Sequence, residues 1–266
     1  MVVTGTITVN PDGSVKAYTV KDVDKLPPAA RQIVQATVPH WQFKPILVAG
    51  KATVAETGMS LRIVADMAKG GNATVRVAGA QFGCNAYQAK SELPMACVPD
   101  ESLQTISCEP PSYPVGAARE GVGGEVFLVL EIDRSGHVAK VAATKVNLDA
   151  YAQDPSWIRR ALAKSAITAA RKWTFRIPTT GRDAAKDHWF VYVPVDYYLG
   201  SGSRKDEYGK WTSYLPGPVR TVPWAAGDST SGDHANSDAL AGDGAPFVRD
   251  GRFVLKTPLT GNGSQS

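Results

Sequence analysis

The chain has 266 residues, of which 43% are hydrophobic and 20% charged, a composition that is ordinary for a soluble globular protein. This length suggests about two domains. The formal net charge is +4, but the lysines and arginines are scattered and no run of them forms a stripe, which disfavours nucleic-acid binding. No apolar stretch approaches the roughly 20 residues of a membrane-spanning helix, so we expect no membrane span.

The first part of the chain predicts a hairpin, a helix and two further strands. Asn10-Pro-Asp-Gly13 is a turn sequence between two alternating segments, and Pro28 suits the first turn of a helix. Apolar residues then recur at helical spacing as far as Trp41, although Pro39 should end the helix. The predicted elements are strands over 3–9 and 15–20, a helix over 28–41, and strands over 59–65 and 73–80, the last after a Gly70-Gly71-Asn72 turn.

Residues 84–110 are interpreted as a connector, because they contain several prolines and no sustained period. All three cysteines, Cys84, Cys97 and Cys108, lie in it, and a pair of loop cysteines is typical of a disulfide in an oxidising compartment. One thiol would be left over, and the pairing stays open. A metal site of three thiolates is the alternative, but CxxC spacing and a nearby histidine are lacking, so we expect neither metal nor cofactor.

The second part of the chain repeats this order of elements. Alternating residues on either side of the Gly136 turn predict a hairpin, and Asp154 is a candidate N-cap with Pro155 at the first helical position. The predicted elements are strands over 125–132 and 138–146, a helix over 155–173, and a last strand over 189–199.

One aromatic signature follows the helix of each part. It is Trp41-Gln-Phe43-Lys-Pro45 in the first part and Trp173-Thr-Phe175-Arg-Ile-Pro178 in the second. Its two copies predict a duplicated β-β-α-β unit. We expect the Trp and Phe rings to pack against the sheet, where truncation to Ala costs about 3–5 kcal/mol. An aromatic ligand platform is the alternative.

Residues 200–266 form a tail rich in Gly, Ser and Asp, which cannot build a core by itself. Its spaced aromatic residues, among them Trp211, Tyr214 and Trp224, could hold it along a domain surface. Residues 247–255, around an Asp250-Gly251 turn, are a candidate final strand.

The chemistry-bearing residues do not converge on an active site, so we expect a protein that is not an enzyme. The histidines, His40, His137, His188 and His234, are spread along the chain and are interpreted as exposed or capping residues. Residues 116–124 resemble a phosphate loop only loosely and are interpreted as a plain turn, since they lack Lys-Ser/Thr and precede a strand. An enzyme such as an envelope hydrolase remains an alternative.

A three-stranded antiparallel unit leaves a sheet edge open, and an open edge can accept an extended peptide by strand addition. In the second unit the candidate edge is the strand over 189–199, where Pro194 lacks an N–H and so fits an edge position. The same proline can equally block unwanted pairing. The residues predicted for this edge are Trp189, Val191, Val193, Val195 and Tyr197.

Several spaced motifs run through residues 110–199. They are Pro-Pro-Ser-Tyr113-Pro114, Ala117 with Ala118, Gly121-Val-x-Gly124-x-Val126, Gly136-x-Val138, and Ala169-Ala-Arg-Lys-Trp173-x-Phe175. With these motifs the segment resembles the TonB C-terminal domain family. Residues 1–83 look like the same domain in reduced form, because they keep Asp12-Gly13-x-Val15 and Trp41-x-Phe43-x-Pro45 but have no Tyr-Pro segment.

The resemblance implies an α+β fold with two tandem domains, each a small three-stranded antiparallel sheet with a helix on one face. The expected divisions are a reduced domain over 1–83, the connector over 84–110, a TonB C-terminal-like domain over 111–199 and the tail over 200–266. The structural signature is formed by Trp41, Phe43, Pro45, Tyr113, Pro114, Gly124, Gly136, Trp173, Phe175 and Pro178.

The function that the resemblance implies is a non-catalytic periplasmic module that binds extended segments of outer-membrane receptors or other envelope proteins. Energy transducers of the family carry an inner-membrane helix and a Pro-rich spacer, and neither is found in this sequence. Residues 1–20 alternate like strands and do not resemble a signal peptide, so we expect either that an export signal or anchor has been removed or that the chain is cytosolic. The alternative function is a structural envelope scaffold whose tail covers the sheet edge, and a homodimer also stays open.

Overall fold

A sheet of eight antiparallel strands extends through the chain in the order β2-β1-β5-β6-β12-β11-β8-β9. The computed structural model describes residues 1–48, 50–67, 72–85, 99–199, 208–228, 239–240 and 246–259. None of the helices in these ranges combines the length and the hydropathy of a membrane span. Two short strand pairs, β3 (Leu47–Val48) with β4 (Lys51–Ala52) and β7 (Gln104–Ser107) with β10 (Thr174–Arg176), lie outside the main sheet.

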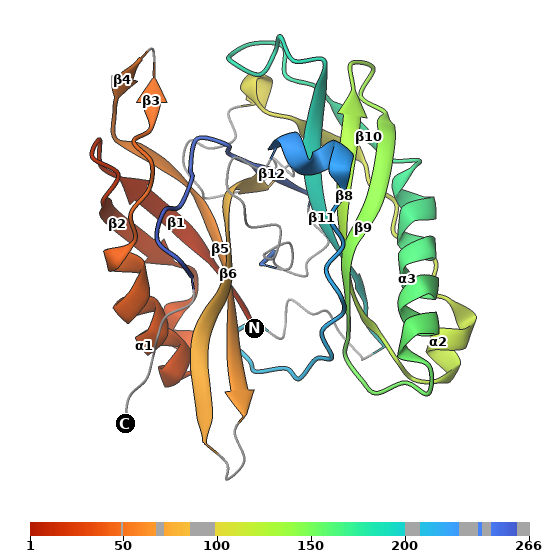
Figure 1. Ribbon diagram of the computed structural model, residues 1–266. Coiled ribbons are helices and arrows are strands. Elements are labelled where there is room, and N and C mark those ends of the chain that lie inside the picture. The colour runs from red at the N-terminus through yellow and green to blue at the C-terminus, as the bar shows by residue number, and fades with distance from the viewer. Residues whose placement is uncertain are drawn as a thin grey trace.

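The first half of the sheet consists of four strands with one helix on their outer face (Figure 1). These elements are β1 (Val2–Val9), β2 (Val15–Val20), α1 (Pro28–Thr37), β5 (Ala55–Met67) and β6 (Ala73–Asn85). Helix α1 passes into a 3₁₀ turn over Val38–His40, where Pro39 removes a backbone donor and so ends the α-helical pattern. Val34 of α1 and Leu61 of β5 belong to the apolar core between helix and sheet.

The second half consists of three strands with α3 on their outer face and α2 beside one end of α3 (Figure 1). Its elements are α2 (Val115–Arg119), β8 (Gly124–Asp133), β9 (Val138–Leu148), α3 (Pro155–Ala170) and β11 (His188–Tyr197). The predicted N-cap is confirmed, because Trp157 N donates to the Asp154 carboxylate at 2.9 Å. Leu162 of α3 is fully buried in a core that includes Leu128 of β8.

The same turn geometry occurs in both halves. Ser14 N donates to Asp12 Oδ1 at 2.9 Å, and Ser135 N donates to Asp133 Oδ1 at 2.8 Å. These bonds, with those from the two serine hydroxyls, stabilise the ionised carboxylates and lower the pKa of both aspartates.

Each turn also meets the aromatic signature of its own half. Phe43 N donates to Gly13 O, and Phe175 N donates to Gly136 O, both at 2.8 Å. A Cβ at Gly136 would lie 2.0 Å from Phe175 O, and one at Gly13 would lie 2.2 Å from Phe43 O. Glycine is therefore required at both turns by close backbone approach.

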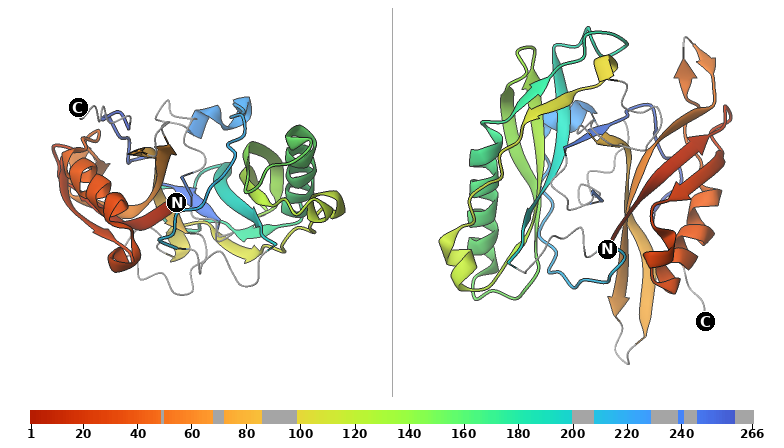
Figure 2. Two further views of the ribbon diagram at one scale, coloured as in Figure 1. Left: turned by 90° about the horizontal axis from the view of Figure 1, so that it is seen from below. Right: turned by 180° about the vertical axis from the view of Figure 1, so that it is seen from behind.

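The two halves face each other, with α1 and α3 on the outer sides and the tail between them (Figures 1 and 2). Strand β12 (Phe247–Arg249) of the tail joins the halves into one sheet, because it pairs with β6 on one side and β11 on the other. The 3₁₀ turn Pro223–Asp228 lies on the inner face of the second half.

The expected pair of separate three-stranded sheets differs from this architecture. In the first half, β6 pairs with β5 between Gly58 and Met67 and adds a fourth strand. The final strand predicted over 247–255 is present but shorter, because the chain turns at Asp250, whose carbonyl accepts from Phe253 N at 3.0 Å. The connector also contains a strand, β7, which the absence of a period did not predict. The predicted Gly70-Gly71 turn lies outside the described residues.

Candidate functional site

Strand β11, the predicted partner-binding strand, lies where the two halves meet. We call the junction of β6, β12 and β11 the seam. On one side it pairs with β8 from His188 to Tyr197. On its other side β12 forms one registered pair, Tyr192 with Phe247. The predicted open edge is thus occupied at Tyr192, where β12 forms a single registered pair with β11.

The side chains predicted for this edge point into the core rather than toward a partner. Trp189, Val191, Val193, Val195 and Tyr197 are all buried, at 0–4% exposure, in the cluster that also contains α3. Tyr197 Oη donates to Leu162 O at 3.1 Å, and burial raises the pKa of this phenol to about 12. A segment added to β11 would therefore be recognised through backbone groups.

The opposite face of β11 is covered by the tail. Phe190 stacks on Trp224 with ring centroids 6.2 Å apart and planes inclined by 23°. The guanidinium of Arg249 lies 3.7 Å from the ring centroid of Tyr192. The expectation that tail aromatics lie along a domain surface holds for Trp224, which makes the second half a sheet covered on both faces.

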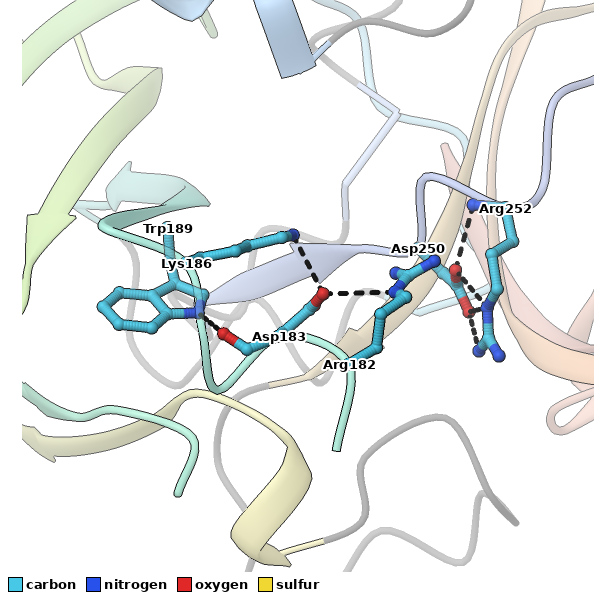
Figure 3. Close-up of polar contacts among 6 residues, drawn as sticks. All are labelled: Arg182, Asp183, Lys186, Trp189, Asp250 and Arg252. Atoms are coloured by element: carbon cyan, nitrogen blue, oxygen red, sulfur yellow. Dashed lines mark hydrogen bonds and ion pairs between the residues drawn. The ribbon is translucent and has the colours of Figure 1, made fainter. Parts of the chain in front are cut away.

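The start of β11 is held by the loop that precedes it (Figure 3). Trp189 Nε1 donates to Asp183 O at 3.1 Å, while the Asp183 carboxylate contacts Arg182 Nε at 3.2 Å and Lys186 Nζ at 3.0 Å. This network orients the Trp189 ring, which faces the core.

A second ionic contact stabilises the turn that follows β12 (Figure 3). Arg252 Nε donates to both carboxylate oxygens of Asp250, at 2.9 and 3.1 Å. The Asp250 hydrogen bonds raise the pKa of Arg252, against the opposing effect of burial. The turn leads the chain from β12 back to the first half, where Phe253 is buried in the core.

Strand β12 is bound more extensively to β6 than to β11. Its three residues pair with Gly83, Cys84 and Asn85. A Cβ at Gly83 would lie 2.1 Å from Val248 O, so the close approach of β12 requires glycine at this position. Cys84 is disulfide-bonded, Cys108 is a thiol, and Cys97 lies outside the described residues.

The aromatic signature residues lie in the two cores. Trp41 and Phe43 are 1% and 0% exposed, and Trp173 and Phe175 are both 2% exposed. They therefore offer no open platform to a ligand. Of the other signature positions, Tyr113 packs edge-on against Tyr197, and Gly124 starts β8 with a φ of 158°. Pro45 precedes β3, Pro114 is the N-cap of α2, and Pro178 follows β10.

The titratable residues show no catalytic or metal-binding grouping in the described ranges. His40, His137 and His188 are exposed and belong to three different regions, while His234 lies outside those ranges. No group of three His, Cys, Asp or Glu side chains in the described part of the chain could hold a metal ion.

The sequence did not predict which strands of the second half the tail contacts. Besides Phe247, Leu215 forms a bridge with Leu148 at the far edge of the sheet, and Arg220 N donates to Thr144 O at 2.8 Å. The spaced tail aromatics were the available signal. They indicated attachment to a surface but not to which strand.

Comparison with known proteins locates the resemblance in the second half. Residues 109–199 match the family model described as Gram-negative bacterial TonB protein C-terminal. Two proteins named "Protein TonB", from two strains of Xanthomonas campestris pv. campestris, are each 37% identical over 97 residues, covering 36% of this chain and 38% of their own length. No solved structure matches the chain. The matched residues contain α2, β8, β9, α3, β10 and β11, so the second half of this sheet is similar to the TonB C-terminal family.

Proposed function

We propose that the chain is a non-catalytic protein-interaction module of the bacterial envelope that binds an extended segment of a partner along β11. The observation that carries this proposal is the seam. On its outward side β11 forms one registered strand pair, Tyr192 with Phe247, in a domain that matches the TonB C-terminal family. A peptide bound there would gain main-chain hydrogen bonds, which is how strand addition contributes affinity.

The partner that fits is an extended segment of an outer-membrane receptor or another envelope protein, and the corresponding location is the periplasm. Support comes from the similarity of residues 109–199 to proteins named TonB. The disulfide at Cys84 agrees with an oxidising compartment.

The first half is proposed to be a reduced copy of the second. Both halves contain an Asp-Gly-Ser or Asp-x-Ser-Gly turn closed on its own aspartate, and both connect the turn glycine to the signature Phe at 2.8 Å. Two copies would offer the two halves of the sheet to one long partner, or to one partner and the tail.

A structural envelope scaffold is the second candidate, and one observation favours it. Strand β12 and the turn that carries Trp224 already cover β11 from its edge and from its inner face. If these contacts are permanent, the edge is closed and the two halves form one rigid body.

Peptide titration separates the two candidates. The full chain, labelled with ¹⁵N, is titrated with peptides taken from the N-terminal segments of outer-membrane receptors, and amide shifts are followed. Strand addition predicts perturbations along 188–199 together with release of 247–249. Shifts confined to other regions would contradict the edge assignment.

A matched pair of variants sharpens this test. Val248→Pro removes a ladder donor from β12 and should weaken its hold on the seam, so peptide affinity should rise if β12 competes with the partner. Val219→Pro, at an exposed tail position outside the strands, is the control and should leave affinity unchanged. Absence of peptide binding in both variants and in the parent chain would favour the scaffold.

A further inference from the structure

Helix α3 carries a basic outer face that the linear distribution of charge does not reveal. The segment 155–182 contains seven Lys or Arg and no Asp or Glu, so the rest of the chain has a net charge of −3 (+4 minus +7). Arg160, Lys164 and Arg171 lie at spacings of four and seven residues, which places them on one side of the helix. The absence of a run of cations along the sequence is compatible with this face, because these residues meet only once the helix has formed.

Three of the seven cations are engaged in contacts within the chain. Arg159 donates to the carbonyls of Val146, Leu215 and Pro216 and so holds the tail, Arg176 contacts Gln104, and Arg182 contacts Asp183.

The other four are exposed, and none of them forms an ion pair with a described residue; they are Arg160, Lys164, Arg171 and Lys172. We call them the α3 basic face. From Arg160 to Lys172 it is about 18 Å long, at 1.5 Å per residue.

Exposed apolar side chains gather at the N-terminal end of this face. Tyr151 is 86% exposed, Val115 64% and Trp157 42%. The Trp157 ring lies over the start of α2, since a Cβ at Gly116 would be 2.1 Å from its Cη2 atom. The loop that carries Tyr151 is connected to α2 as well, because Gln153 N donates to a Glu120 carboxylate oxygen at 3.3 Å.

The acidic side chains at this end are already engaged. Asp154 caps α3 through Trp157 N, and Glu120 accepts from Gln153 N. Both bonds come from neutral backbone N–H groups and leave the carboxylate charges in place, but neither carboxylate forms an ion pair with a cation of the α3 basic face. Figure 1 shows α3 and α2 on the outermost side of the second half, where a large surface can approach them.

We propose that the α3 basic face, with Tyr151, Val115 and Trp157, adsorbs to the surface of a bilayer that contains anionic phospholipids. Four exposed cations, two on α3 and two directly after it, complement an extended anionic surface. Tyr and Trp prefer the boundary between headgroups and acyl chains, and this preference selects a lipid surface over a nucleic acid. The apolar face of α3 is buried against β8, so contact is superficial and the helix does not insert.

The test is sedimentation of the full chain with phosphatidylglycerol vesicles and with phosphatidylcholine vesicles, at low and at physiological salt. Binding should require the anionic lipid and should weaken as salt screens the charges. Equal binding to both kinds of vesicle would overturn the proposal.

Charge variants locate the surface. The triple variant Arg160→Gln, Lys164→Gln, Arg171→Gln should lower the partition coefficient by about a hundredfold, since each of the three cations near an anionic surface contributes about fivefold. The control triple is Lys21→Gln, Lys44→Gln, Lys51→Gln, which removes the same charge from exposed positions of the first half. If both triple variants lost the same fraction of vesicle binding, the binding would depend only on the net charge of the protein, and the proposal would be overturned.

An aromatic variant separates lipid from other polyanions. Tyr151→Ser should weaken vesicle binding several-fold, whereas Trp211→Ser, at another exposed aromatic position, should not. Duplex DNA serves as the competing polyanion. Binding to DNA that is tighter than binding to vesicles, and that does not respond to Tyr151→Ser, would overturn the lipid assignment. Because no peptide is present in these experiments, their failure would leave strand addition at β11 untouched.

Discussion

The Arg62 guanidinium and the Glu125 carboxylate connect the two halves of the molecule through a buried ion pair. Arg62 Nη2 and Glu125 Oε2 are 3.0 Å apart, and both side chains are 8% exposed. Arg62 belongs to β5 of the first half and Glu125 to β8 of the second. The guanidinium also lies 5.5 Å from the ring centroid of Tyr214 and 5.8 Å from that of Phe127, so the tail shares this contact.

Glu125→Gln should destabilise the protein by about 3–5 kcal/mol, because it removes the charge of the carboxylate that lies 3.0 Å from the buried Arg62 guanidinium. The double variant Arg62→Met, Glu125→Leu should lose much less, since it removes both charges and keeps the volume. Urea unfolding followed by circular dichroism measures both. The exposed pair Lys25–Asp22 is the control, and Lys25→Gln should cost less than about 1 kcal/mol. A loss for Glu125→Gln no larger than that of the control would contradict the prediction.

Gly136→Ala should destabilise the second half more than Gly121→Ala does. Both glycines have positive φ, 80° and 67°, so both substitutions incur the cost of a left-handed residue, about 1–2 kcal/mol. At Gly136 the new Cβ would also meet Phe175 O at 2.0 Å, whereas at Gly121 nothing lies within 4 Å. The difference in free energy of unfolding should exceed about 1 kcal/mol. Equal losses would show that the turn can move away from the signature.

Trp173→Phe should destabilise more than Trp41→Phe, although both rings are buried. Trp173 Nε1 donates to Glu109 O at 2.8 Å, while Trp41 Nε1 is buried with no hydrogen-bond partner among the described residues. The first substitution removes a hydrogen bond, and the second removes an unsatisfied donor. The difference should be about 1–2 kcal/mol in thermal or urea unfolding. The reverse order would mean that Trp41 Nε1 does find a partner in solution.

Stability should fall between pH 10 and pH 12 through Tyr197. Burial raises the pKa of Tyr197 to about 12 in the folded chain, above the value of 10 for an unperturbed tyrosine. Over this window the unfolded chain loses the phenol proton and the folded chain keeps it, so the free energy of unfolding decreases as pH rises. Tyr197→Phe should flatten this part of the pH profile. Tyr151→Phe, at an exposed position, should retain the parental profile, and a parental profile in Tyr197→Phe would refute the assignment.

The regular elements of both halves could be predicted because their signals are local. Turn residues around Gly13 and Gly136, alternation in β8 and the Asp154 cap each act over a few residues, and each appears in the structure at the predicted place. A further signal was present in β8, where Phe127 and Val129 are as buried as the residues that face α3. A continuous apolar run indicates burial on both faces, and the tail supplies the second covering layer.

The seam could not be predicted, because β12 has three residues and no periodicity of its own. Its place depends on pairing with β6 and β11, which are distant in the sequence. The α3 basic face was available to a helical projection of the sequence, but a search for consecutive cations cannot detect residues that meet only after the helix forms.

The position of β12 also has a consequence for the order of folding during synthesis. Phe247 and Val248 of β12 follow β6 and β11 in the sequence, so the facing edges of β6 and β11 are both made before the strand that pairs with them. Until then each nascent chain carries two open edges, which can pair with those of a neighbouring chain on the same polysome. A chaperone that shields strand edges would therefore be needed most in the interval between the synthesis of β11 and that of β12.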